Sequence, residues 1–168
     1  MGANLEDIEQ AVKEIHIPKV VSCPSKPIEI PGITAADIFD AGDCFGTIFE
    51  IAVPKSGEIR SAIFLDLDDE GSQVDLEIFK DSITQIASDA AWDLPSTELL
   101  RFVTELAFVA FDNHITCQSS DLTNIGKAYT APGGKLYIQA VCRGTPTIAA
   151  NKSPRVQLQI SSDDPDWR

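Results

Sequence analysis

The stretch IRSAIFLDLDDEGSQVDLEIFK, residues 59–80, decides the fold, because apolar and polar residues alternate on both sides of a turn. The apolar residues of each half share one face of a strand: Ile63, Leu65 and Leu67 before the turn, and Val74, Leu76 and Ile78 after it. With Glu70-Gly71 as a two-residue turn, a hairpin pairs Leu65 with Leu76. A slip of one residue would break every such pair, so the stretch predicts an antiparallel hairpin of fixed register.

Short alternating segments recur from Cys44 onward, separated by Gly and Pro turns. The further expected strands are residues 45–53, 106–111, 125–130, 136–142 and 156–160. Residues 106–111 are apolar on both faces, which favours a central strand. Residues 82–91 fit one or two helical turns, and residues 97–106 begin either a helix or a strand. The pattern predicts an all-β fold, a jelly-roll-like antiparallel β-sandwich.

The N-terminal part differs from the rest of the chain. Residues 4–15 place Leu5, Ile8, Val12 and Ile15 on one stripe and predict a short helix. Residues 16–32 carry four prolines, so an extended arm without regular structure is expected. Its apolar residues need burial on the domain or on a neighbouring subunit, and they are the candidate partner-binding residues Ile17, Val20, Val21, Ile28 and Ile30. We therefore divide the chain into a helix and arm, residues 1–32, and a β-sandwich domain, residues 33–168.

Length and composition exclude several classes of protein. A chain of 168 residues with 43% hydrophobic residues suits one globular domain with a real core. No apolar run approaches the roughly 18 to 20 residues that span a bilayer, and the acidic N-terminus lacks the features of a signal peptide. A net charge of −13 argues against nucleic-acid binding. The charge serves either solubility or attachment to a basic partner.

Cys23, Cys44, Cys117 and Cys142 show no metal-ligand spacing and are expected to be free structural thiols, with a disulfide as the alternative. Cys142 continues an alternating strand and is expected in the core.

An acidic segment at the expected hairpin tip has the spacing of a calcium loop, with Asp66, Asp68, Glu70, Gly71 and Glu77. The flanks alternate as strands instead of forming helices, and Gln73 stands where a calcium loop has an apolar residue. In the predicted register Asp66 and Asp75 lie opposite each other, and a cation would offset their repulsion. We expect a solvated acidic tip, with an adventitious cation as the alternative.

No residues are expected to be catalytic, and no cofactor or metal site is expected. His114 lies near Asp112 and Cys117, but the residues follow an apolar strand within one loop, so local hydrogen bonds are expected. Lys127 and Tyr129 are expected to point outward from a strand. Two histidines in distant segments are too few for a cupin-type metal site.

Two parts of the chain resemble β-sandwich proteins of tailed bacteriophages. The first comprises Gly46-Thr47 to Val53, the turn Pro54-Lys55-Ser56-Gly57, and Leu65 to Gly71. The second runs from Gly126-Lys127-Ala128-Tyr129 to Gly144-Thr145-Pro146-Thr147 and closes with Pro154 to Ile160. The similarity covers roughly residues 44 to 161, and the relevant class is the capsid cement or decoration protein.

The resemblance implies a non-enzymatic virion structural protein on the capsid surface, assembled in the host cytoplasm. It implies two partners, the major capsid protein and further copies of the chain in a homo-oligomer, typically a trimer. Neither nucleic acid nor membrane is an expected partner. The alternative is a carbohydrate- or receptor-binding module of a phage fibre or tail appendage, a reading that rests on analogy of fold.

Overall fold

The computed structural model describes residue 5 and residues 19–34, 37–162, 164 and 167. The helix predicted over residues 4–15 lies, apart from Leu5, outside the described residues. The chain is predominantly β and its strands pair antiparallel, which confirms the predicted all-β class.

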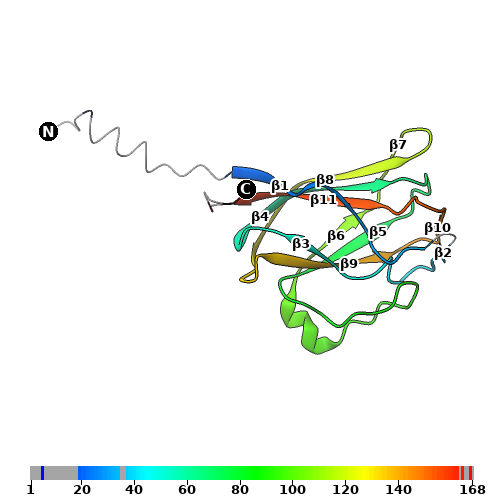
Figure 1. Cartoon of the computed structure of the whole chain (residues 1–168), viewed down its shortest axis with the longest axis horizontal. Coiled ribbons are helices and arrows are strands. Elements are labelled where there is room, and N and C mark those ends of the chain that lie inside the picture. Colours follow the sequence, from blue (N-terminus) through cyan, green and yellow to red (C-terminus); the bar gives the residue numbers. More distant parts are fainter. Residues whose placement is uncertain (1–4, 6–18, 35–36, 163, 165–166, 168) are drawn as a thin grey trace.

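Two sheets carry most of the strands (Figure 1). The five-stranded sheet has, in spatial order, β1 (Lys19–Glu29), β11 (Arg155–Ser162), β4 (Ser56–Asp66), β8 (Gln118–Thr130) and β7 (Asp112–Asn113). The four-stranded sheet has β3 (Phe49–Ala52), β9 (Lys135–Cys142), β5 (Val74–Phe79) and β6 (Phe102–Phe108). A two-stranded ribbon joins β2 (Asp37–Ile38) to β10 (Thr147–Ile148), and one 3₁₀ helix, η1, spans Ser96–Arg101.

Strand pairing is nested around the middle of the chain. β5 pairs with β6, β4 with β8, β3 with β9 and β1 with β11. Residues 80–101 connect the two halves of the chain, and the strands before that segment pair in reverse order with strands after it. Apart from the short hairpin of β7 and β8, long-range pairing builds the two sheets.

The predicted hairpin over residues 59–80 is wrong. β4 pairs with β8 and β11, whereas β5 pairs with β6 and β9 in the other sheet. Between them the Asp66 carboxylate accepts hydrogen bonds from the backbone N–H groups of Asp68 (2.9 Å) and Gly71 (2.7 Å). These bonds stabilise a turn at which the chain leaves the five-stranded sheet, because the Asp66 carboxylate accepts hydrogen bonds from N–H groups that would otherwise donate to a neighbouring strand. Alternation alone fits strands in facing sheets as well as strands in one hairpin.

The buried face of β4 also differs from the prediction. Ala62 and Phe64 are buried, while Ile63 and Leu65 are only half-buried. The register with β8 shifts between Ile59 and Ser61, so a bulge moves the following residues to the opposite face.

The main core draws buried side chains from both sheets. Phe64 of β4 illustrates this, because its ring lies 5.5 Å from that of Phe108 in β6. Val156, Leu158 and Ile160 are fully buried in β11, as the alternation predicted. Cys142 is also fully buried, which confirms its predicted place in the core.

The outer face of the four-stranded sheet is covered as well. Residues 80–101 pass over this face (Figure 1), and Trp92 packs against Phe79 with ring centroids 6.4 Å apart. Gln139 and Val141 of β9 have no exposed surface; the Gln139 side chain donates to the Gly46 carbonyl, and Val141 pairs with Cys44. Residues 82–91 contain no helix; of residues 97–106, the first part belongs to η1 and the part from Phe102 belongs to β6.

The expectation of a central strand at residues 106–111 is wrong. β6 ends at Phe108 and lies at the edge of the four-stranded sheet, and Val109 is 64% exposed. The apolar run continues past the strand into an exposed connection. Apolar residues on both faces of this segment therefore do not indicate a strand that is buried on both faces.

The expectation that residues 16–32 lack regular structure is wrong for residues 19–29. These residues form β1, which pairs with β11 on both sides of a register shift between Cys23 and Ile28. β1 lies at the sheet edge, where proline is tolerated because one side of the strand needs no donor. This part of the expected arm therefore packs on its own chain.

Candidate functional site

The predicted partner-binding residues lie in different environments. Val20 is 54% exposed, Val21 and Ile28 pack partly buried against the core, and Ile30 is fully buried. Ile17 lies outside the described residues. The burial that Ile30 needs is supplied within the chain, and Val20 is the one of these described residues that is largely open to a partner.

The acidic residues with calcium-loop spacing do not come together. Asp66 is 4% exposed and is used by the turn after β4, Asp68 accepts a 2.5 Å hydrogen bond from the Ala149 N–H, and Glu77 lies in the other sheet. Asp75 pairs in register with Ala107 and Val141, so its expected position opposite Asp66 is wrong. Across the described ranges no three potential ligands gather to hold a metal ion.

The residues around His114 form a turn between β7 and β8. The His114 N–H donates to the Cys117 carbonyl at 2.9 Å, and His114 Nε2 lies 2.9 Å from Ser119 Oγ. These local hydrogen bonds confirm the sequence interpretation. All four cysteines are free, as predicted.

The expectation that Tyr129 points outward is wrong. Its side chain is 6% exposed and its hydroxyl donates to the Pro54 carbonyl at 3.1 Å. Burial raises the pKa of this hydroxyl well above its usual value. Lys127, two residues earlier on β8, is exposed as expected.

A cleft of about 720 Å³ opens where β8 faces the beginnings of β6 and β9. Its basic residues are Lys80, Arg101, Lys127 and Lys135, and Asp81 is its one acidic residue. The lining therefore carries four positive charges and one negative charge, a formal +3, in a chain whose net charge is −13. Phe102, Tyr129 and Tyr137 also line the cleft, and of these Tyr129 is buried.

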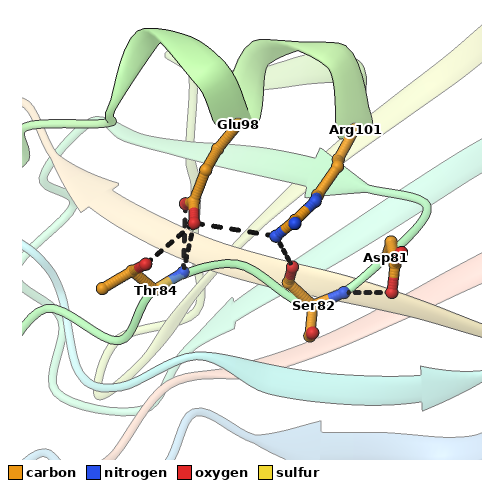
Figure 2. Close-up of polar contacts among 5 residues, drawn as sticks. All are labelled: Asp81, Ser82, Thr84, Glu98 and Arg101. Atoms are coloured by element: carbon orange, nitrogen blue, oxygen red, sulfur yellow. Dashed lines mark hydrogen bonds and ion pairs between the residues drawn. The ribbon is translucent and has the colours of Figure 1, made fainter.

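Arg101 is held at this cleft by a buried carboxylate (Figure 2). Glu98, 8% exposed, accepts hydrogen bonds from the Thr84 N–H at 3.0 Å and from the Thr84 hydroxyl at 2.8 Å. These bonds lower the pKa of Glu98, so it is ionised at neutral pH. Arg101 Nη1 lies 3.6 Å from Glu98 Oε1 and donates to the Ser82 carbonyl. Glu98 and Ser82 thus fix the direction of the guanidinium.

The other three cations of the cleft differ in how far their charge is offset. Lys135 forms a 2.5 Å ion pair with Glu50, which raises the pKa of the lysine. Lys80 and Lys127 are exposed and form no ion pair with another residue in the described part of the chain. Their charges remain available to a ligand.

Sequence reasoning missed the cleft because its four cations are far apart in the chain. Lys80 follows β5, Arg101 ends η1, Lys127 lies on β8 and Lys135 begins β9. No motif joins them. Only the nested pairing, which places the end of β5 beside the beginnings of β6 and β9, could have revealed the group.

A second polar group lies on the outer face of the four-stranded sheet. Arg143 Nε donates to Asp75 Oδ2 at 2.5 Å. Glu77 pairs in register with Glu105, and burial together with the Glu105 charge raises the pKa of Glu77 to about 7. These residues do not line the cleft.

An exposed apolar group lies beside the cleft, on and next to η1. Leu99 is 57% exposed, Leu100 is 81% exposed and Phe102 is 37% exposed. η1 lies at the periphery of the molecule, on the outer side of the four-stranded sheet (Figure 1). Exposed apolar groups of this kind often mark contacts with another protein.

Nowhere in the described ranges does a helix have the length and hydropathy needed to cross a membrane. Comparisons with protein-family models, with curated proteins and with solved structures found no match to this chain.

Proposed function

We propose that the chain is a non-enzymatic virion structural protein, a capsid cement or decoration protein that stabilises the head through oligomeric contacts. Its partners would be the major capsid protein and further copies of itself, in a trimer on the capsid surface. The observation that carries this proposal is the exposed pair of leucines on η1, Leu99 and Leu100. In the isolated chain two adjacent leucines at the periphery expose apolar surface to water. Burial of that surface against a partner would contribute favourable free energy to the contact.

The proposal includes a finer description of the fold, a jelly-roll-like antiparallel β-sandwich. Nested pairing supports it, because a jelly roll is one long antiparallel hairpin rolled into two facing sheets. The pairs β1·β11 and β4·β8 lie in one sheet, and the pairs β3·β9 and β5·β6 lie in the other. Side chains from both sheets contribute to one core.

The resemblance to tailed-phage β-sandwich proteins supports the choice of a virion role. The chemistry of the described residues agrees with a structural role, because His114 and Cys117 are used in a local turn and the carboxylates with calcium-loop spacing are dispersed. Acidic charge outside the cleft suits a protein that attaches to a surface of opposite sign.

Electron microscopy of labelled virions tests the proposal. Virions are purified from a culture of the cells or phage that carry the gene. They are labelled with antibodies raised against residues 37–162. The cement role predicts label spread over the heads. Label confined to tails or fibres would instead support a receptor-binding module, and absence of the chain from purified virions would overturn both.

A further inference from the structure

We infer that the cleft between β8 and the beginnings of β6 and β9 is a binding site for an acidic saccharide, a sugar or short oligosaccharide that bears carboxylate or phosphate groups. The inference does not depend on a role in a virion. It rests on the size of the cleft, on its charge and on the aromatic surface beside that charge.

The size of the cleft favours a small ligand. Its volume of about 720 Å³ falls within the roughly 300–1,000 Å³ of typical small-molecule sites. The contact of a large macromolecule is usually a flatter and wider surface. A few sugar rings fit this space, whereas a folded partner does not enter it.

The charge of the cleft selects an anion. The lining is formally +3, although the rest of the chain then sums to −16. Lys80 and Lys127 are not neutralised by another described residue, and Arg101 is held in place by Glu98 and Ser82. A guanidinium positioned in advance loses less conformational entropy when it binds an oxyanion. Glu98 is therefore a positioning residue for Arg101.

The aromatic residues favour a saccharide over a bare ion. Phe102 is 37% exposed and Tyr137 is half-buried, and both line the same cleft as the lysines. An aromatic ring offers apolar surface to the C–H face of a sugar, while the cations bind its acidic groups. Inorganic phosphate would use the cations alone.

Isothermal titration calorimetry tests the inference with five probes at low salt: trigalacturonic acid, glucose 6-phosphate, neutral maltotriose, inorganic phosphate and a hexaglutamate peptide. The inference predicts binding of at least one acidic sugar, at least tenfold tighter than maltotriose and inorganic phosphate. The first two probes distinguish carboxylate from phosphate as the acidic group. Failure of both acidic sugars to bind, or equal binding of inorganic phosphate or of the peptide, would overturn the inference.

Variants locate the binding. Lys80→Gln combined with Lys127→Gln should weaken the acidic sugar at least tenfold, because it removes the two unpaired cations of the cleft. Lys19→Gln combined with Lys26→Gln makes the same change of charge on β1, at the far edge of the five-stranded sheet, and should change affinity less than twofold. Equal weakening by both pairs would mean nonspecific attraction and would contradict a site in the cleft. Thermal melting of each variant checks that the fold is kept.

The role of Glu98 has its own readout. Glu98→Gln should weaken acidic-sugar binding several-fold although it leaves the surroundings of the cleft one unit more positive, because Arg101 then loses the ionic partner that positions it. Binding as tight as that of the parent, or tighter, in a variant that melts at the parent's temperature would contradict the positioning role.

Discussion

The four-stranded sheet has two covered faces that are built from different chemistry. On the inner face Val74, Leu76 and Ile78 of β5 are buried in an apolar core. On the outer face Asp75 and Glu77 of the same strand alternate with these residues; Glu77 lies opposite Gln139, and Asp75 pairs with Arg143. Apolar burial stabilises without regard to pH, whereas buried polar groups stabilise only when their charges and hydrogen bonds are matched.

The outer face is incompletely matched. Asp75 Oδ1 and Gln139 Oε1 are buried and find no hydrogen-bond partner among the described residues. The two faces of β5 therefore contribute to stability in different ways. The contribution of its inner face is independent of pH, whereas that of its outer face depends on pH. Four predictions sharpen this comparison.

The largest expected effect is on the inner side. Phe64→Ala should lower the free energy of unfolding by about 3–5 kcal/mol, because Phe64 is 1% exposed and packs on Phe108. Urea unfolding at pH 5 and pH 8 should give similar losses. Phe102→Ala, at a partly exposed ring, is the control and should cost clearly less. A loss from Phe64→Ala as small as that of the control would contradict a core shared by the two sheets.

The second-largest loss of stability is expected on the outer face, where one substitution removes an ion pair. Arg143→Met leaves the Asp75 carboxylate, whose side chain is 6% exposed, without its cation. We expect a loss of about 2 kcal/mol, less than for a fully buried pair because Arg143 is 35% exposed. Adding Asp75→Asn should restore part of the loss. A double variant no more stable than Arg143→Met would show that the pair itself is unimportant.

The outer side should also depend on pH. Burial, and then the Glu105 charge, raise the pKa of Glu77 from 4.5 to about 7, so the folded chain binds this proton more tightly than the unfolded chain. The contribution to stability is complete below pH 4.5 and is lost as the pH rises through about 7. Glu77→Gln, which stays neutral, should exceed the parent in stability by about 2 kcal/mol at pH 8 and match it at pH 4.

Urea unfolding between pH 4 and pH 8 measures this difference, and Glu70→Gln at an exposed loop position is the control. A difference between parent and Glu77→Gln that does not change with pH would contradict the raised pKa.

The smallest expected effect concerns a single hydrogen bond. Tyr129→Phe removes the hydroxyl that donates to the Pro54 carbonyl and should cost about 1 kcal/mol. Tyr137→Phe, at a half-buried ring on the same cleft, should cost less. Equal losses in thermal melting would contradict a special role for the Tyr129 hydroxyl.

The sequence was sufficient for the class of the fold and for several strands. Alternation correctly identified the buried faces of β9 and β11, because Leu136, Ile138, Val156 and Leu158 are buried as expected. It could not identify strand partners. A period of two says which residues share a face, but not whether the next strand lies alongside in the same sheet or across the core.

The same limit explains the errors at β4 and β1. The bulge near Arg60 reverses the buried face, and nothing in the local alternation announces it. The four prolines of residues 16–32 argued against a strand there, yet the edge position of β1 tolerates the two that it contains, Pro24 and Pro27. The cleft was missed for a related reason, since cations from four segments meet there only after the strands have paired.

Light scattering coupled to size-exclusion chromatography tests the central claim, that this is an assembly protein whose exposed leucines are covered in an oligomer. The full chain is compared with Leu99→Ser combined with Leu100→Ser, and with Val109→Ser combined with Ile115→Ser, which change exposed apolar residues outside η1. The account predicts a trimer for the full chain and for the Val109/Ile115 control, and a monomer for the Leu99/Leu100 variant. A monomeric full chain, or a trimer unaffected by the leucine substitutions, would contradict it.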